Sequence, residues 1–152
     1  MPQTEQPEPL DITSSETSLV FCDREGLAAR SNIISPWLHK LEADTKGYYT
    51  ARKVAERFRD DEWQCWVVLD GHECLAVLGT SVFEDDSGRL VAHPHFLIGT
   101  RYKEWEHLYD VLEEWAKLGC YSIRVETRPG WGRRIFKPKG YRMTHVVYEK
   151  VL

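Results

Sequence analysis

Two histidines stand two residues apart in the stretch "HPH", at His93 and His95. Alternate residues of a β-strand point to the same side of a sheet, so both imidazoles are expected on one face. Imidazole titrates near neutral pH and ligates metals, which makes the pair a candidate general base or metal site. No third ligand has a convincing spacing, so we predict no metal site, and ordinary strand histidines remain the alternative.

A carboxylate is the next candidate catalytic group. Glu126 lies near the end of the apolar stretch "YSIRVET", where a strand would deliver it to one edge of a sheet. A carboxylate in that place is a possible general base. The alternative is a loop carboxylate that only forms a salt bridge.

The next stretch, "RPGWGRRIFKPKG", is rich in basic residues. Guanidinium groups form paired hydrogen bonds with planar anions, so we predict a surface that recognises an anion or an acidic protein partner. The tryptophan either caps the core or offers a surface for stacking. A solvated loop is the alternative for the charges. The candidate residues are Arg128, Trp131, Arg133, Arg134 and Lys137.

Local patterns predict the elements that position these groups. Asp70-Gly71 separates two apolar runs, which is typical of a two-residue hairpin turn. Pro94 cannot donate to a strand ladder, so its strand should carry a bulge or lie at an edge. Ser35 and Thr50 are candidate helix caps. Strands are expected at 18–22, 65–69, 73–83, 89–98, 121–127 and 141–152, and helices at 35–44, 50–61 and 104–119.

The order of these elements predicts the fold class. A strand joined to the next through a long helix tends to pair with it in parallel, by a right-handed crossover. The other neighbours are joined by short turns and should be antiparallel. We therefore expect an α/β (α+β) fold with a mixed, mostly antiparallel central sheet flanked by helices.

Composition limits the classes of function. The 152 residues suffice for one domain, which we place at 18–152, after a flexible tail at 1–17 that has little to bury. A net charge of -4 gives no global reason to bind nucleic acid. Four scattered cysteines indicate neither a disulfide framework nor a zinc ribbon. No apolar run would span a bilayer, so a soluble, intracellular (cytoplasmic) protein is expected.

The element order, together with the ending "IFKPKGYRMTHVVYEKVL", resembles the GNAT superfamily of acyl-CoA N-acyltransferases. The resemblance implies a bulged fourth strand and a loop before the long helix that holds the CoA pyrophosphate through glycine-rich backbone. The corner "RPGWGRR" is also similar to one in short GNAT-like proteins encoded by tailed phages.

Three positions depart from the family pattern. The loop after Arg101, the one candidate cofactor-binding residue, contains no glycine and carries Glu104 and Glu106. Phe136 occupies the position of the family's proton-donating tyrosine, and Pro129 that of its asparagine. We also expect Trp105 and Phe136 to narrow the gap that admits the pantetheine arm.

These departures lead to two hypotheses. In the first, the chain has lost acyl-CoA catalysis, needs no cofactor and acts as a structural or interaction protein, as a component of a tailed-phage virion that binds other virion proteins. In the alternative, it is a divergent N-acetyltransferase that uses acetyl-CoA. The two hypotheses differ in whether acetyl-CoA stabilises the protein.

Overall fold

The computed structural model describes residues 17–127 and 129–152. The expected tail at 1–17 lies outside the described residues except for Thr17, and so does Arg128 of the basic corner. The chain forms the elements β1 (Ser18–Cys22), α2 (Arg24–Asp44), α3 (Ala51–Arg59), β2 (Gln64–Asp70), β3 (Glu73–Glu84), β4 (Leu90–Gly99), α4 (Tyr102–Trp105), α5 (Tyr109–Lys117), β5 (Ser122–Ile123) and α6 (Pro129–Trp131). Short 3-10 turns at Glu106–Leu108 and Lys137–Lys139 and a π-helical turn at Gly132–Phe136 complete the list.

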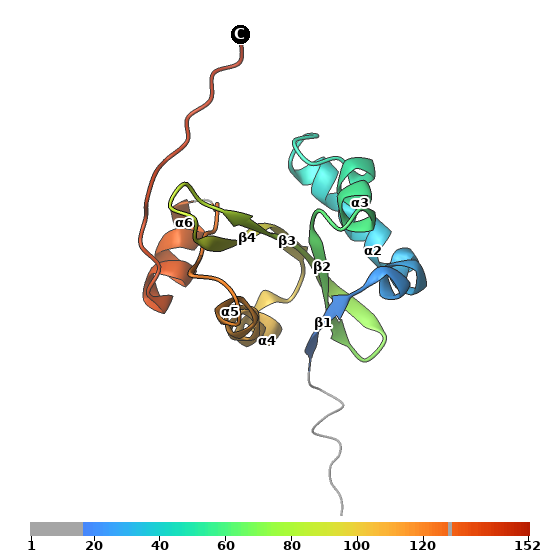
Figure 1. The fold of residues 1–152 in the computed structure, drawn as a ribbon. Coiled ribbons are helices and arrows are strands. Elements are labelled where there is room, and N and C mark those ends of the chain that lie inside the picture. The colour runs from blue at the N-terminus through green and yellow to red at the C-terminus, as the bar shows by residue number, and fades with distance from the viewer. Residues whose placement is uncertain (1–16, 128) are drawn as a thin grey trace, which may run out of the picture.

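The strands form one sheet in the order β1-β2-β3-β4-β5 (Figure 1). Neighbouring strands from β1 to β4 run antiparallel, whereas β5 runs parallel to β4 after the crossover through α4 and α5. The predicted fold class, a mixed and mostly antiparallel sheet flanked by helices, is confirmed.

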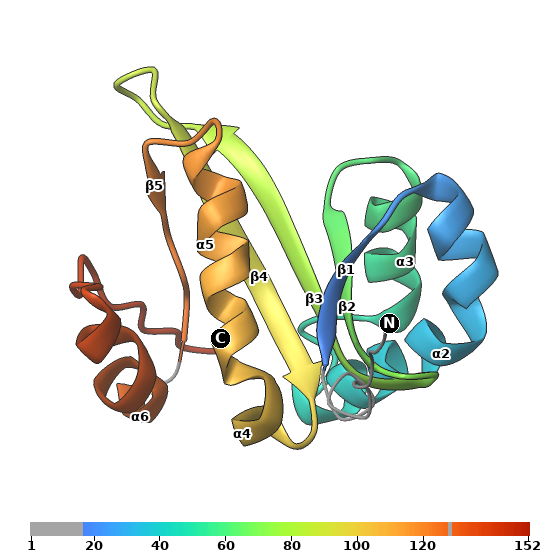
Figure 2. The ribbon, with the colours of Figure 1, turned by 90° about the horizontal axis from the view of Figure 1, so that it is seen from below.

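Helices cover both faces of the sheet (Figures 1 and 2). Cys65 and Val67 of β2 pack with α2 and α3, whereas Trp66 and Val68 pack with α4, α5 and the C-terminal turns. Successive strand residues point to opposite faces, so a strand covered on both sides reads as a continuous apolar run. That explains the unbroken sequence "CWVVL".

The first helix differs from the prediction. It begins at Arg24 rather than near Ser35, because the Asp23 side chain accepts a hydrogen bond of 2.8 Å from the Gly26 N–H and caps the helix there. Pro36 therefore lies inside the helix and not in its first turn. The Thr50 cap of α3 is confirmed, since its Oγ1 accepts from the Lys53 N–H at 3.2 Å.

The expected irregularity at Pro94 is a bulge in β4. Gly79 of β3 pairs with Phe96 and Thr80 pairs with Pro94, so His95 is the extra residue. The indole of Trp63 contacts the rings of both His95 and Phe96, which shows that these neighbours face the same side. Gly79 is required opposite the bulge, because a Cβ there would lie 2.5 Å from the Phe96 ring.

Two predicted strands are shorter or missing. The strand expected at 121–127 is reduced to Ser122–Ile123, and the segment 142–152, expected as the last strand, forms none. The physical reason is pairing: beyond the bond from the Arg124 N–H to Ala92, β5 no longer pairs with β4, and the last segment pairs with no described residue. A strand sequence without a neighbouring strand leaves its backbone hydrogen bonds to water.

Candidate active site

A cleft of about 430 Å³ opens beside β4 on the side of α3. The loop between α2 and α3 and the start of α3 form one wall, and β4 forms the floor. Its lining residues are Tyr48, Tyr49, Thr50, Lys53, Val54, Arg57, Trp63, His93, His95 and Glu126. All three candidate catalytic residues therefore lie around one cleft, although they come from two separate segments of the chain.

His95 is held on three sides. Its ring stacks on the indole of Trp63, with centroids 4.0 Å apart and planes 13° from parallel. Its Nε2 lies 2.7 Å from the Ser81 hydroxyl in a hydrogen bond, and its backbone carbonyl accepts one of 3.0 Å from the Tyr49 hydroxyl. These contacts fix both the ring and the backbone of the bulged residue.

His93 lies beside it, with the two imidazole centroids 4.4 Å apart. Its side chain is 9% exposed, and its Nδ1 is buried without a hydrogen-bond partner among the described residues. A buried ring nitrogen without a partner is rare, because it forfeits the hydrogen bonds it had in water. His93 thus lines the cleft with a ring whose Nδ1 is closed to solvent and bonded to no described residue.

Both imidazoles are neutral near pH 7. Burial lowers the pKa of His95 to about 4, and the neighbouring His93 and Arg57 add to the effect. Burial also lowers the pKa of His93, but there the negative charge of Glu126 acts in the opposite direction. Glu126 thus favours the protonated form of His93, which makes His93 the better proton acceptor of the pair.

Sequence reasoning missed the other lining residues of this cleft, of which Trp63 and Tyr49 make the closest contacts with the bulge. Trp63 covers His95, and Tyr49 bridges the α2–α3 loop to the bulge. Burial, with a smaller effect from the charges of Tyr48 and Glu126, raises the pKa of the Tyr49 hydroxyl to about 12, so it stays a hydrogen-bond donor. The local signal was the dense aromatic content of "GYYT" and "DEWQ", but the contact with β4 could not be read from it.

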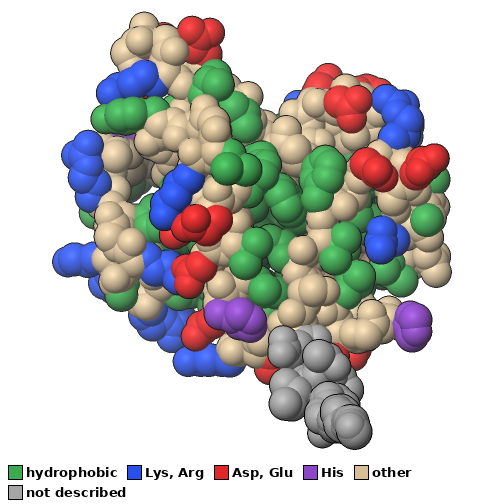
Figure 3. Space-filling model, turned by 60° about the horizontal axis from the view of Figure 1, so that its bottom comes forward, with side chains coloured by type: hydrophobic (Ala, Val, Ile, Leu, Met, Phe, Trp, Pro, Cys, Tyr) green, Lys and Arg blue, Asp and Glu red, His purple; other side chains and the backbone are tan. Residues whose placement is uncertain are grey.

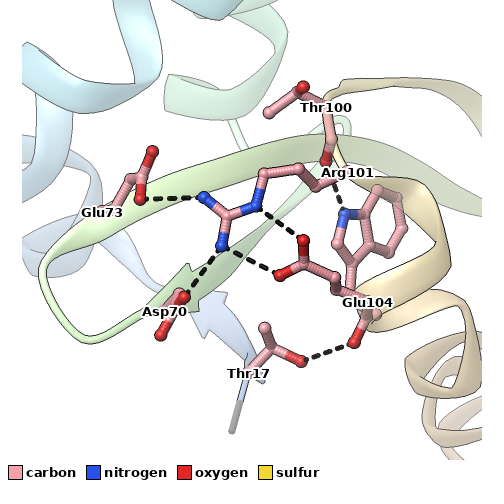
Figure 4. Close-up of polar contacts among 7 residues, drawn as sticks. Thr17, Asp70, Glu73, Thr100, Arg101 and Glu104 are labelled. Atoms are coloured by element: carbon pink, nitrogen blue, oxygen red, sulfur yellow. Dashed lines mark hydrogen bonds and ion pairs between the residues drawn. The ribbon is translucent and has the colours of Figure 1, made fainter. Parts of the chain in front are cut away.

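Arg101 lies away from the cleft and is surrounded by carboxylates (Figure 4). It contacts Glu104 at 2.9 and 3.0 Å, Glu73 at 3.1 Å and Asp70 at 3.0 Å. These contacts raise its pKa, with Glu104 contributing most. A pyrophosphate does not fit here, because it would compete with three carboxylates for one guanidinium.

The gap expected to admit the pantetheine arm is packed with side chains. Trp105 and Phe136 are both buried in one cluster that extends from Leu97 of β4 to Val125 beyond β5. Tyr102 at the start of α4 contacts Trp131 with ring centroids 5.3 Å apart. These contacts agree with the expectation that aromatic side chains narrow this region.

The basic corner is helical: α6 is followed by the π-helical turn Gly132–Phe136 and the 3-10 turn Lys137–Lys139. Trp131 is half-buried against the core on the α5 side of the sheet, which agrees with core capping. The side chains of Arg133, Arg134 and Lys137 are exposed. Figure 3 shows basic side chains gathered on the side of the molecule that carries these C-terminal turns. Binding of an anion or a partner at this surface stays a prediction.

Two wider classes of site were also considered. No three His, Cys, Asp or Glu side chains of residues 17–127 and 129–152 are placed to hold a metal ion. In the same part of the chain, no helix combines the length and the apolar character that a membrane span requires.

Comparison with known proteins rests on structure. No family model matches the sequence, and no curated protein matches it either. A solved structure of a probable acetyltransferase superposes with a TM-score of 0.69 at 14% identity, covering 89% of this chain and 97% of that one. A ribosomal-protein-alanine N-acetyltransferase from Brucella melitensis biovar Abortus 2308 gives 0.67 at 10% identity, covering 90% and 99%. An acetyltransferase from Trypanosoma brucei gives 0.63 at 15% identity, covering 90% and 100%.

These similarities correct one expectation. The hypothesis that the chain has lost acyl transfer and serves as a structural component of a phage virion was wrong: the solved structures it resembles are acetyltransferases, and none of them points to a virion. The sheet order, the bulged fourth strand and these superpositions together identify the fold of this chain as that of the GNAT acetyltransferases.

Proposed function

We propose that this protein is an N-acyltransferase whose amine acceptor binds in the cleft of His93, His95 and Glu126. The observation that carries the proposal is the meeting of these three side chains around one cleft, at the bulge of the fourth strand. The acetyltransferases of the same fold support the class of reaction.

The reaction has a simple balance. An amine nitrogen attacks the carbonyl carbon of an acyl thioester, a C–N bond forms and the C–S bond breaks. The nitrogen loses one proton, and the departing thiolate takes one up. An amine attacks only through a free lone pair, so a group in the cleft must accept the proton of the ammonium form.

His93 is the base that we assign. It lines the cleft, burial lowers its pKa so that it is neutral at pH 7, and the negative charge of Glu126 favours the imidazolium that forms. His95 is a positioning residue, since Ser81 and Trp63 hold it in place and its pKa of about 4 makes it a weaker base. Glu126 and the ring of Tyr48 suit a cationic amine, whereas Lys53 and Arg57 bring two positive charges to the same cleft.

The acyl donor is a thioester that does not place a pyrophosphate at the start of α4, because Asp70, Glu73 and Glu104 occupy Arg101 there. Acetyl-CoA remains a donor in this proposal only if its phosphates contact another part of the surface. We derive no step through that group. The residues of this chain supply the acceptor site and the proton acceptor.

The test is amine-dependent release of thiol, followed with a thiol reagent, over a panel of primary amines and two donors, acetyl-CoA and S-acetyl-pantetheine. We expect His93→Gln to lower kcat about 100-fold or more with little change in KM for the amine. Ser87→Ala, in the exposed β3–β4 turn, is the matched control and should keep full activity. Absence of thiol release with every amine and both donors, or full activity of His93→Gln, would overturn the proposal.

A further inference from the structure

The cleft beside β4 is lined by charges of both signs. Glu126 brings a negative charge, and Lys53 and Arg57 of α3 bring two positive ones. Because burial keeps both imidazoles neutral at pH 7, the positive charges outnumber the negative ones by one. An amine without any other charged group would satisfy Glu126 and be repelled by the other two charges. The lining therefore asks for an acceptor that is more than a cation.

Lys53 and Arg57 are presented together by one helix. They are four residues apart in α3, so their side chains lie on the same side of it, and both line the cleft. Their neighbours Val54 and Phe58 are buried in the core, which fixes the helix against the sheet. The two positive charges thus come from a rigid element and not from a loop.

Arg57 is held in place but only partly engaged. Its guanidinium lies over the indole of Trp63, 4.9 Å from the ring centroid, and its Nη1 donates to Glu62 at 3.2 Å. Its Nε and Nη2 donate to no described residue. The side chains of Arg57 and Arg101 are both 37% exposed, but three carboxylates bind Arg101 and one binds Arg57. Arg57 therefore keeps donors that fit a second anion.

The carboxylates that approach this pair lie outside the cleft. The Lys53 ammonium is 3.9 Å from Glu56, and the side chain of Glu62 is 57% exposed. Ion pairs this exposed contribute little and are easily replaced. Glu56, Asp60 and Glu62 line a separate hollow next to the cleft, and none of them lines the cleft itself. An anion in the cleft would thus meet the two cations without meeting these carboxylates.

The opposite charges lie beside different histidines. Arg57 covers the indole on which His95 stacks, and its charge is one of the causes that lower the pKa of His95. The charge of Glu126 acts instead on His93. A ligand with its amine at Glu126 therefore has that amine next to His93, the assigned base, and its other end toward Arg57. The volume of about 430 Å³ is in the range of clefts that hold small molecules.

We propose that the acceptor is a small amine that also carries an anionic group, a carboxylate or a phosphate. The amine binds at Glu126 and His93, and the anion binds at Arg57 and Lys53. Lys53 and Arg57 are then the residues that determine specificity for the acceptor. The role of the amine rests on the proposed acyl transfer, whereas the anion site rests on the charges of the cleft alone.

The first test compares amines in matched pairs by thiol release: 4-aminobutyrate with n-butylamine, and O-phosphoethanolamine with ethanolamine. The first pair tests a carboxylate and the second a phosphate. We expect kcat/KM to be about tenfold or more higher for the anionic member of at least one pair, mainly through a lower KM. Equal values within both pairs would overturn this proposal and leave acyl transfer standing. Absence of thiol release with every amine would instead overturn the proposed function.

The second test changes the cations. Lys53→Gln and Arg57→Gln should each lower the preference for the anionic member by about tenfold. Arg57→Lys keeps the charge but loses the paired donors, so it should retain part of the preference. Arg59→Gln is the matched control, because Arg59 is an exposed arginine of the same helix that does not line the cleft, and it should keep the full preference. An unchanged preference in both glutamine variants would overturn the assignment.

The third test needs no turnover and so separates the anion site from acyl transfer. 4-Aminobutyrate, O-phosphoethanolamine and n-butylamine are titrated into the protein, and the indole N–H resonance of Trp63 reports binding. We expect at least one of the two anionic amines to bind about tenfold or more tightly than n-butylamine, and Arg57→Gln to remove the difference. Equal binding of all three, or no binding of either anionic amine, would overturn the anion site.

Discussion

The imidazole of His95 lies flat on the indole of Trp63, at 4.0 Å between ring centroids. The contact joins the bulge of β4 to the loop that precedes β2, and it removes one face of the imidazole from water. Desolvation of this kind is the main reason that the pKa of His95 falls to about 4.

Removing the indole should reverse that effect. In Trp63→Leu, water reaches the ring, so we expect the pKa of His95 to rise by about one unit or more toward 6.5. The measurement is a titration of the imidazole resonances by nuclear magnetic resonance. Trp37→Leu, which removes an indole from α2 instead, is the control and should leave the titration of His95 unchanged. An unaltered pKa in Trp63→Leu would show that the stacking does not cause the shift.

Stability should depend on pH through the same residue. On acidification the unfolded chain protonates His95 near pH 6.5, whereas the folded chain does so only near pH 4. The contribution of His95 to the free energy of unfolding is therefore complete above pH 6.5, is lost between pH 6.5 and 4, and amounts to roughly 1–3 kcal/mol. Urea unfolding at several pH values should show a shallower decline for His95→Gln than for the unchanged chain. Equal slopes would contradict the assignment.

The environment of Arg101 predicts how strongly the protein prefers acetyl-CoA over S-acetyl-pantetheine as the acyl donor. Because carboxylates already surround this guanidinium, the phosphates of acetyl-CoA should gain little there. We expect the kcat/KM values for acetyl-CoA and S-acetyl-pantetheine to lie within about tenfold of each other, a difference of 1.4 kcal/mol or less. A preference for acetyl-CoA of several orders of magnitude, lost in Arg101→Ala, would show that the site does hold a pyrophosphate.

In the C-terminal corner, the half-buried tryptophan should contribute to the stability of the protein, whereas the exposed arginines should not. Trp131 packs on Tyr102, so Trp131→Ala should lower the free energy of unfolding by about 2–3 kcal/mol. Arg133→Glu combined with Arg134→Glu changes only exposed side chains and should leave the melting temperature nearly unchanged. Thermal unfolding of both variants tests this directly. The interpretation fails if the double charge reversal is as destabilising as the loss of the indole.

Residue types predicted the local structure correctly where the conformation depends only on the residue itself, as in a turn or a bulge. Gly71 adopts the positive φ of 61° that a hairpin turn needs, and Pro94 does mark a bulge. The start of α2 was missed because Ser35-Pro36 is also a good helix start, and only the Asp23 cap shows that the helix begins earlier. Two adequate start signals within one helix cannot be ranked from sequence alone.

The candidate site was predictable in part. The spacing of His93 and His95 placed them on one face, but the approach of Glu126 depends on the parallel pairing of β5 with β4, a contact between distant segments. Trp63 was overlooked because nothing near it in the sequence indicates the bulge that it covers. The strands predicted at 121–127 and 141–152 were wrong in extent, since only Ser122–Ile123 forms one and a strand also requires a neighbour.

The bulge at His95 interrupts the alternation of side chains in β4, so that the residues after it point to the opposite face from the one that regular alternation would give. His93, before the bulge, and His95, at the bulge, both face α3. After it, Phe96 and Ile98 face the same side, so one strand presents polar groups and then core residues in the same direction. Deleting Pro94 would restore an even ladder, but it would turn His95 toward α5, into the place of Pro94, while His93 and Phe96 kept their side. A single-residue deletion in this strand would thus remove a functional group from the cleft without removing it from the protein, which makes chain length, and not only composition, a determinant of the site.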